Sequence, residues 1–376
     1  MIQRNVLNSD RHIVLMKYSS WFAGLDGVDS ILISNGGENA IDKAFFYATG
    51  ADEGIFEGSS VIVTPDSERA RMYVYTLEEQ SARKTSHDVI PAGSQAQMKE
   101  NISLALKDKK RVGINFSSMT LEMYNDLRSV LPYTQFVDVS GNILNSRMIK
   151  TDDEIKRLRE AARISSEALP SIIEHFKEGM TEKELAADIV YEMMKAGADG
   201  PSFESIVCFG SNASIPHHLP ESRKLKRGDF VLMDYGAVYR RYCSDNTRTV
   251  VFGKAEEKQK EIYSIVYEAQ KKAMDMIRDG VNGRDVNSKA LEVIDDTEYR
   301  GKLMHGIGHG IGLEVHDHHA LGSSDFTLRK GMAITDEPGI YIPGYGGVRI
   351  EDDLIVKEDG FSLITNQPSK DLIEVS

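Results

Sequence analysis

The first 145 residues alternate short apolar runs with segments of helical periodicity. Strands are typically short runs of β-branched or aromatic residues bounded by Gly, Pro, Ser or Asp. Six runs fit this description: SILISN, AFFYATG, SSVIVTP, RMYVYT, RVGINFS and TQFVDVS. Two segments, SQAQMKENISLALKDKK and TLEMYNDLRSVL, have apolar residues three and four positions apart. This spacing is typical of amphipathic helices. The pattern predicts an α/β domain over residues 1–145 with its own core. Its polar residues do not group as a catalytic set.

Two helix-start signals open the rest of the chain, residues 146–376. Thr151 with Glu154, and Thr181 with Glu184, fit capping boxes that precede amphipathic runs. Pro170 lies inside the first run, where we expect a kink or a break. Strand-like runs follow, then the helical segments EKQKEIYSIVYEAQKKAMDMIRDG and VNSKALEVIDD, and then strands again. This repetition predicts an α+β domain built from two similar halves.

Composition narrows the class of protein. The chain has 376 residues and a net charge of −13, which argues against a nucleic-acid or anionic-membrane partner. Its apolar runs fall well short of the ~20 residues that span a bilayer. The only cysteines, Cys208 and Cys243, lie in apolar contexts and are expected to be buried reduced thiols. Near the N-terminus only Ile13–Met16 is apolar, so no secretory signal is evident, and we expect a cytoplasmic protein.

Five ionisable residues of the C-terminal half lie in apolar, glycine-punctuated, strand-like segments. They are Asp234, Asp245, His309, Glu337 and Glu351. Burying one carboxylate costs several kcal/mol unless something neutralises it, and two divalent cations would balance four carboxylates. The set therefore predicts a dinuclear metal site and a metal-dependent hydrolase. Oxygen-rich ligation with a single imidazole suits Mn²⁺, Co²⁺ or Zn²⁺.

The spacing of these residues suggests two facing pairs of carboxylates. Asp234 and Asp245 are 11 residues apart, the odd separation of directly opposed residues in a hairpin with a two-residue loop. Glu337 and Glu351 are 14 apart, which fits a hairpin loop with an odd number of residues. His309 has glycines on both sides that permit close approach of the backbone.

Each of these residues also has an ordinary structural interpretation. An Asp before Tyr-Gly is more often a turn former than a ligand, and a single His is more often a satisfied core or surface residue. Five such coincidences in one domain are much less probable than one shared site. Among the other polar residues, Asp336 should point away from the metals if its segment is a strand. His218, His318 and His319 are interpreted as exposed loop residues, whereas His316 follows a strand-like alternation and could face the metals.

The run HGIGHGIGLEVHD, residues 305–317, carries a family resemblance together with MDYGAVYRRYCSDNTRTV, DEPGIYIPGYGGVRIED and PHHLPESRKLKRGDF. These motifs resemble the Xaa-Pro dipeptidase (prolidase) and aminopeptidase P branch of the pita-bread metallopeptidases. The resemblance is strong over residues 145–376. It is weaker in the N-terminal domain, where FYATG looks like the creatinase-type amino domain. It implies a creatinase-like α/β domain followed by a pita-bread α+β catalytic domain.

The resemblance also implies a role for each site residue. Asp234 would chelate one metal, Asp245 and Glu351 would bridge both, and His309 and Glu337 would bind the second. A hydroxide bridging the two metals would be the nucleophile, with Glu337 as proton shuttle. His217 and His316 would orient substrate and stabilise the oxyanion; counting back from Arg-Gly-Asp at 227–229 favours His217 over its neighbour for this role. Arg349 would steady Glu351 or help to bind substrate, and His305 would have a supporting role.

The implied reaction is hydrolysis of the bond that precedes proline in dipeptides or short peptides, by a homodimeric enzyme. The compact N-terminal domain leans towards a dipeptidase over an aminopeptidase P. A methionine aminopeptidase shares the five ligands but fits GLEVHD and the full N-terminal domain less well. Metal-free creatinase chemistry would leave the carboxylates unneutralised. A non-catalytic pita-bread binding module would be expected to have lost ligands, and here all five are present.

Overall fold

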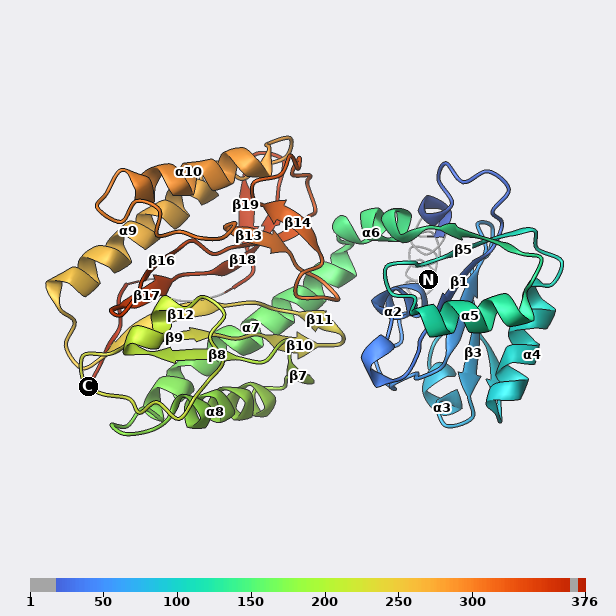
Figure 1. The fold of residues 1–376 in the computed structure, drawn as a ribbon, viewed down its shortest axis with the longest axis horizontal. Coiled ribbons are helices and arrows are strands. Elements are labelled where there is room, and N and C mark those ends of the chain that lie inside the picture. The colour runs from blue at the N-terminus through green and yellow to red at the C-terminus, as the bar shows by residue number, and fades with distance from the viewer. Residues whose placement is uncertain (1–17, 366–370) are drawn as a thin grey trace, which may run out of the picture. The chain divides into compact units, whose positions relative to one another are not determined.

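The computed structural model describes residues 18–365 and 371–376, so the Ile13–Met16 stretch lies outside the described residues. The chain divides into two compact units, Met1–Arg147 and Met148–Ser376. This division lies two residues beyond the predicted boundary between residues 145 and 146. Figure 1 shows both units as ribbons.

The N-terminal unit is an α/β domain around one mixed sheet. Its strands are β1 (Ile31–Ser34), β2 (Ser60–Val63), β3 (Arg71–Tyr75), β4 (Asp88–Ala92), β5 (Arg111–Ile114) and β6 (Gln135–Asp138), in the order β4-β3-β2-β1-β5-β6. Its helices are η1 (Glu38–Ala40), α2 (Lys43–Thr49), α3 (Glu79–Ala82), α4 (Gln95–Leu106), α5 (Leu121–Val130) and α6 (Ser140–Met148), the last of which runs one residue past the division. Apolar residues of α4 and α5 pack on the sheet at Leu32, Ile62 and Val112.

One predicted strand of this unit is wrong. AFFYATG forms helix α2, which begins after Asp42 and ends at Gly50. The Asp42 carboxylate accepts a hydrogen bond from the backbone N–H of Ala44, and Gly50 takes the left-handed conformation that closes many helices. Residues 44–49 of the helix are all buried. Because every face of the helix is buried, its sequence has no alternation of apolar and polar residues with a helical period. The apolar run therefore predicts a strand.

The second unit begins with two capped helices, α7 (Asp152–Glu174) and α8 (Glu182–Lys195). The predicted capping boxes at Thr151 and Thr181 are both confirmed. Pro170 does not break the helix, because α7 continues past it to Glu174, so the expected break is wrong. Helices α9 (Glu257–Met274) and α10 (Gly283–Asp295) form the second pair, where the sequence predicts them.

Between the helix pairs lie several small sheets. Their strands are β7 (Gly200–Pro201), β8 (Ile206–Phe209), β9 (Phe230–Asp234), β10 (Ala237–Tyr239), β11 (Tyr242–Cys243), β12 (Thr247–Phe252), β13 (Gly308–Gly310), β14 (His318–Leu321), β15 (Ala333–Asp336), β16 (Gly339–Ile342), β17 (Gly346–Arg349), β18 (Asp352–Val356), β19 (Phe361–Leu363) and β20 (Glu374–Val375). The sheet orders are β20-β12-β9-β8, β14-β13-β15-β18-β19, β11-β10-β7 and β16-β17, and the turn η2 (Gly210–Ser214) follows β8.

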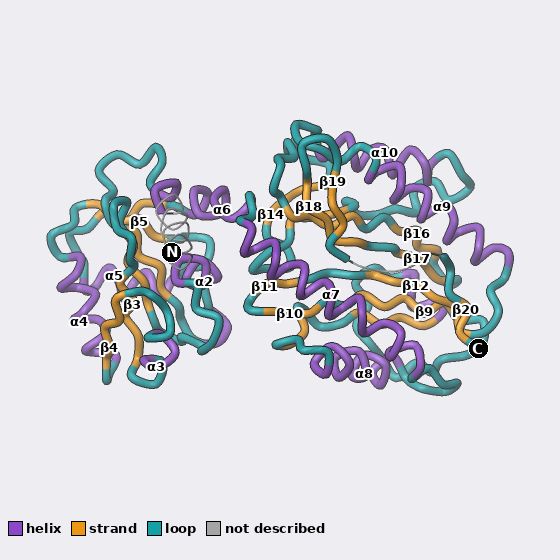
Figure 2. The backbone as a smooth tube through the Cα atoms, turned by 180° about the vertical axis from the view of Figure 1, so that it is seen from behind, coloured by secondary structure: helices purple, strands orange, loops and turns teal. Residues whose placement is uncertain are grey.

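Alternate side chains of β9 pack against different helix pairs on the two faces of the sheet. Val231 and Met233 pack with α7 and α8, whereas Phe230 and Leu232 pack with the core that includes α9 and α10. The two helix pairs accordingly cover opposite sides of the strands in Figure 1. Figure 2, the view from the opposite side, shows α7 running across the front of the strands. Cys208 and Cys243 are buried and form no disulfide, as predicted. Within the described ranges, no helix combines the length and the apolarity needed to cross a membrane.

Candidate active site

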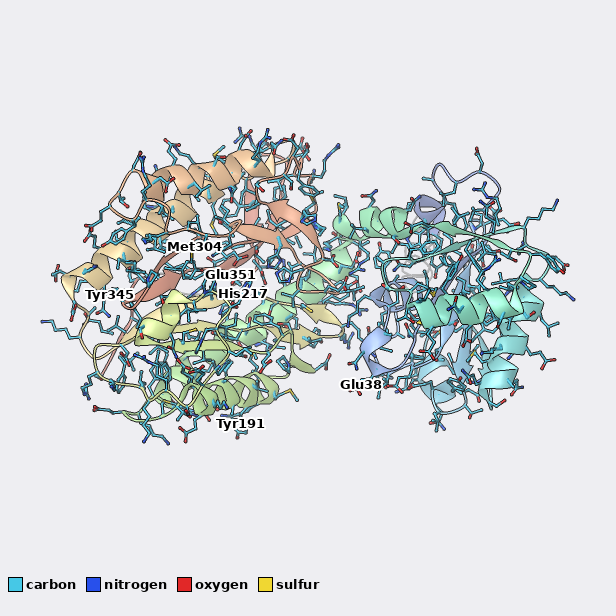
Figure 3. All side chains as sticks on the ribbon, in the orientation of Figure 1. Glu38, Tyr191, His217, Met304, Tyr345 and Glu351 are labelled. Atoms are coloured by element: carbon cyan, nitrogen blue, oxygen red, sulfur yellow. The ribbon has the colours of Figure 1, made fainter. Side chains whose placement is uncertain are left out.

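All nine residues singled out from the sequence line one cavity of about 460 Å³ in the second unit. They are His217, Asp234, Asp245, His305, His309, His316, Glu337, Arg349 and Glu351. They come from strand ends and loops of both halves of the unit. In Figure 3, His217 and Glu351 lie close together near the middle of this unit.

The first carboxylate pair comes from β9 and the residues before β12. Strands β10 and β11 form the predicted hairpin, and its two-residue loop is Arg240-Arg241. In this register Asp234 lies opposite Thr247, so the predicted direct opposition of Asp234 and Asp245 is wrong. Asp245 is two residues away from the opposed position. Because side chains alternate with a period of two, both carboxylates still point to the same face.

The second pair has the predicted register. Strands β16 and β17 pair around the three-residue loop 343–345, with Gly339 opposite Arg349. Strands β15 and β18 continue the same register, with Asp336 opposite Asp352. The positions of Glu337 and Glu351, between these two ladders, therefore face each other. Asp336 is buried and does not line the cavity, as the alternation predicts.

His309 enters from β13, where glycines on both sides let the backbone pass close to its neighbours. A side chain at Gly308 would collide with the carbonyl of Thr335, and one at Gly310 with the ring of His318, which confirms the predicted close approach. Nδ1 of His309 lies 3.2 Å from the carbonyl of its neighbour Gly310, so Nε2 is the nitrogen that faces the carboxylates. Nε2 lies 3.6 Å from Oδ2 of Asp245 and 3.7 Å from Oε1 of Glu337.

The donor atoms of the site fit a divalent cation. One ligand atom each from Asp245, His309 and Glu351 lies within 4.8 Å of the others. Oδ1 of Asp234, Oδ1 of Asp245 and Oε1 of Glu351 are buried and find no hydrogen-bond partner among the described residues. Buried carboxylate oxygens without donors are costly. Several of them converging on one imidazole form the hard, oxygen-rich donor set that divalent metals bind.

The protonation of the metal-free site reflects its burial. Burial raises the pKa of Asp245, and the neighbouring charges of Glu351 and Asp234 raise it further. Burial likewise raises the pKa of Glu351, and it raises that of Glu337 to about 8. The pKa of His309 is lowered to about 3, mainly by burial. Without a metal, the site therefore favours neutral side chains, so a divalent cation binds in competition with protons.

Arg349 connects the carboxylates to a hydrogen-bond network that the sequence does not predict. Its guanidinium donates to Oδ2 of Asp234 at 2.5 Å, to the hydroxyl of Thr247 at 3.0 Å and to the hydroxyl of Tyr341 at 2.9 Å. The hydroxyl of Thr247 in turn donates to Oε2 of Glu351 at 2.7 Å. Arg349 thus contacts Asp234 directly and reaches Glu351 through Thr247.

Tyr341 and Asp353 are two further members of the site that sequence reasoning missed. The Tyr341 hydroxyl lies 2.8 Å from Nε2 of His305. The Asp353 carboxylate accepts the backbone N–H of Asp245 at 2.9 Å. The only sequence signal for Asp353 is its position two residues after Glu351, on the same face of the strand.

The histidines divide differently from the prediction. His217 and His316 are exposed at the cavity, and the ring of His316 lies 4.1 Å from that of His309, centroid to centroid. The interpretation of His218 and His318 as exposed loop residues is wrong, because both are buried. His218 is paired with the buried carboxylate of Glu182, a residue that nothing in the local sequence connects to it.

Comparisons with known proteins agree with this geometry. Residues 156–358 match the model of metallopeptidase family M24, and residues 24–149 match the creatinase/prolidase N-terminal domain. The chain is 37% identical to an Xaa-Pro dipeptidase of Pyrococcus horikoshii over 345 residues, covering 92% of this chain and 94% of that relative. The N-terminal unit is thus a creatinase-type domain, and the second unit has the pita-bread fold.

Solved structures give the same result. An Xaa-Pro dipeptidase from Bacillus anthracis superposes with a TM-score of 0.87 at 34% identity, covering 96% of this chain and 99% of that one. An X-Pro aminopeptidase from Thermotoga maritima superposes with a TM-score of 0.86 at 31% identity, covering 91% and 96%. With this fold, these relatives and a carboxylate–histidine cavity at the centre of the second unit, the chain belongs to metallopeptidase family M24 and is a peptidase.

Proposed function

We propose that this protein is an Xaa-Pro dipeptidase that works with two divalent metal ions, drawn from Mn²⁺, Co²⁺ and Zn²⁺. One observation carries the proposal. Asp234, Asp245 and Glu351 each have a buried carboxylate oxygen without a hydrogen-bond partner in the described part of the chain, and all three residues line the cavity that His309 and Glu337 also line. Asp234, Asp245, His309, Glu337 and Glu351 would hold the ions. When bound, the ions would supply a water of lowered pKa and polarise the scissile carbonyl.

Glu337 is the residue proposed to move the proton. Its carboxylate is part of the cavity wall and lies within 4 Å of His309. Its raised pKa in the metal-free protein reflects a poorly solvated position in which a carboxylate readily accepts a proton. We therefore assign to Glu337 the transfer of a proton from the attacking water to the leaving proline nitrogen.

His217 and His316 are proposed to bind the substrate at the reacting carbonyl. Both are exposed side chains on the cavity, and among the described residues neither forms a hydrogen bond with a carboxylate. An imidazole N–H directed at the carbonyl oxygen would stabilise the oxyanion that develops there. His305 and Arg349 both hydrogen-bond to Tyr341, and Arg349 also contacts the carbonyl of Pro216, the residue before His217, so a supporting role is proposed for both.

The dipeptide is the proposed substrate, and a longer peptide is the alternative. The 37% identity to an Xaa-Pro dipeptidase over most of both chains supports the dipeptide. The similarity to an X-Pro aminopeptidase structure keeps the longer substrate as a second candidate. In either case the bond cleaved precedes proline, whose nitrogen in that bond carries no hydrogen.

Turnover of three peptides separates the candidates. Met-Pro, Met-Pro-Ala and Met-Ala-Ala would be offered to the protein with added Mn²⁺, Co²⁺ or Zn²⁺, and the released amino acid would be measured. Cleavage of Met-Pro alone supports the proposal. Cleavage of Met-Pro-Ala indicates an aminopeptidase P, and cleavage of Met-Ala-Ala indicates a methionine aminopeptidase. Failure to cleave any of them with any metal would favour a binding module. The homodimer and the cytoplasmic location stay predictions.

A further inference from the structure

The segment that carries His217 is a long connection between β8 and β9, and we call residues 210–221 the His217 loop. Apart from the turn η2 it contains no regular structure. Its internal backbone hydrogen bonds are short-range, such as Ile215 N–H to the carbonyl of Asn212 and His218 N–H to that of Ile215. Such bonds alone do not fix a loop on a surface, so its position depends on contacts with other elements.

Four of the hydrogen-bonding contacts that position this loop go to one buried carboxylate. Glu182, the first residue of α8, is completely buried. Its Oε1 accepts from the backbone N–H of Phe209 at 2.7 Å and from Nδ2 of Asn212 at 3.0 Å. Its Oε2 accepts from the backbone N–H of Glu221 at 2.9 Å and lies 3.1 Å from Nε2 of His218. All four contacts go to the His217 loop or to the residue that precedes it.

The geometry of Glu182 differs from that of an ordinary helix cap. Capping of α8 is provided by Thr181 and Glu184, which exchange the reciprocal bonds of a capping box. Glu182 is therefore not needed to satisfy the start of the helix. A buried carboxylate is retained only where its hydrogen bonds offset its desolvation, and here those hydrogen bonds hold the loop at both ends and at His218.

The loop is also held from the side of the cavity. Nη1 of Arg349 lies 3.5 Å from the carbonyl of Pro216. The residue before His217 thus contacts Arg349, and the residue after it contacts Glu182. His217 lies between these two attachments, with its own side chain at the cavity.

We propose that Glu182 and His218 are positioning residues that act through His217: the buried carboxylate clamps the loop so that the His217 imidazole meets the substrate carbonyl. This inference rests on the proposed function, in which His217 binds that carbonyl. Misplacing a substrate-binding group by about 1 Å can cost on the order of 100-fold in rate. Loss of the clamp should therefore lower kcat, with little effect on metal binding.

The experiment combines kinetics with hydrogen exchange. His218→Ala removes one contact and leaves the three others of Glu182, whereas His218→Gln keeps an N–H that can reach the carboxylate. Glu182→Gln changes the carboxylate itself. Glu184→Gln is the matched control, because Glu184 is in the same helical turn and serves only the cap. For each variant, kcat and KM on Met-Pro with Mn²⁺, the bound metal, and amide exchange of residues 209–221 would be measured.

We expect His218→Ala and Glu182→Gln to lower kcat by about 10- to 100-fold with unchanged metal content and faster exchange in the His217 loop. His218→Gln should recover most of the loss. In a His217→Ala background, His218→Ala should add nothing, because residues that act through one another are not additive. The inference would be overturned if the kcat losses of His217→Ala and His218→Ala multiplied in the double variant. It would also be overturned if His218→Ala and Glu182→Gln both had a normal kcat.

The outcomes for the inference and for the proposed function remain distinguishable. A wild-type protein that cleaves none of the peptides overturns the proposed function and, with it, the catalytic purpose of the clamp. Exchange in residues 209–221 still reports in that case whether Glu182 anchors the loop. A wild type that cleaves Met-Pro, together with a His217→Ala variant of normal kcat, overturns the inference and the role given to His217 but leaves the proposed dipeptidase activity standing.

Discussion

The guanidinium of Arg349 lies 2.5 Å from Oδ2 of Asp234, and the two side chains are only 3% and 12% exposed. The other nitrogens of Arg349 donate to the hydroxyls of Thr247 and Tyr341, and these hydrogen bonds fix the orientation of the guanidinium plane. Asp234 therefore presents its remaining oxygen, Oδ1, which has no hydrogen-bond partner among the described residues. Arg349 thus orients a proposed metal ligand rather than binding in the cavity as a free cation.

Arg349→Lys should weaken metal binding while retaining the charge. Lysine lacks the planar fork that holds three partners at once, and loss of a residue that orients a metal ligand typically costs about 10- to 100-fold in metal affinity or activity. Calorimetric titration of the apoprotein with Mn²⁺ would measure the effect. Arg284→Lys, in an exposed ion pair with Asp325, is the control and should bind metal normally. Equal affinities in all three proteins would contradict this role for Arg349.

Asp245→Asn should lower the metal content and abolish hydrolysis of Met-Pro. The substitution removes a charge from the cluster of Asp245, His309 and Glu351 without changing side-chain size. Asp336→Asn is the matched control, since Asp336 is also a buried carboxylate but does not line the cavity. Metal analysis after dialysis and a peptide assay would be compared. An Asp245→Asn protein that keeps both its metal and its activity would refute the site.

The sequence predicts which residues gather in this cavity better than it predicts how they are arranged. Which residues share a face of a strand can be predicted reliably, because side chains alternate with a period of two whichever strand is the partner. Asp234 and Asp245 therefore share a face even though the hairpin loop lies one residue from its expected place. The exact position of the loop is not evident from the sequence, because Arg240-Arg241 lacks the Asn-Gly or Asp-Gly signal of such turns.

Contacts between distant segments are the part that the sequence does not reveal. His218 pairs with Glu182, 36 residues earlier in the chain. Asp353 accepts the N–H of Asp245, 108 residues away. Local patterns carry no information about such pairs, so the sequence alone places His218 on the surface and does not indicate Glu182 or Asp353. Helix α2 is a different case, because its caps Asp42 and Gly50 are local signals in the sequence, but the aromatic run between them favours a strand.

The stability of the metal-free protein should fall as the pH rises from about 6.5 to 8.5. The pKa values of Asp245, Glu351 and Glu337 are raised by burial, that of Glu337 to about 8. In this range the folded apoprotein binds more protons than the unfolded chain, so the free energy of unfolding decreases with pH. The pKa values of His305 and His309 are lowered to about 4 and about 3, so these imidazoles oppose the trend only below pH ~6.5.

Urea unfolding in excess chelator at several pH values would measure this decline, which should be on the order of 2 kcal/mol for one proton over two pH units. Metal-loaded protein should show a much smaller slope, because bound cations keep the carboxylates ionised throughout. Glu337→Gln cannot titrate and should reduce the slope in the apoprotein. A metal-free protein that becomes more stable over this range would be inconsistent with protonated carboxylates in the folded state.

Lys150→Met should destabilise the second unit by about 3–5 kcal/mol, because it leaves a buried charge without its partner. Nζ of Lys150 lies 2.6 Å from Oδ2 of Asp317, and both side chains are only 1% exposed. Adding Asp317→Leu should recover much of the loss, since apolar replacement of a whole buried pair is often tolerated. Denaturant unfolding would compare these proteins. Lys330→Met, in an exposed pair with Glu358, should cost less than about 1 kcal/mol.

The hairpin between β10 and β11 offers a test of backbone strain. Arg240 and Arg241 both have positive φ values, 44° and 73°, in a conformation that costs a residue with a side chain about 1–2 kcal/mol. Arg240→Asn and Arg240→Ala both remove the exposed side chain, but only asparagine adopts this conformation readily. The asparagine variant should therefore be more stable than the alanine variant by about 0.5–1 kcal/mol in thermal or urea unfolding. Equal stability of the two variants would mean that the turn relaxes when the arginine is removed.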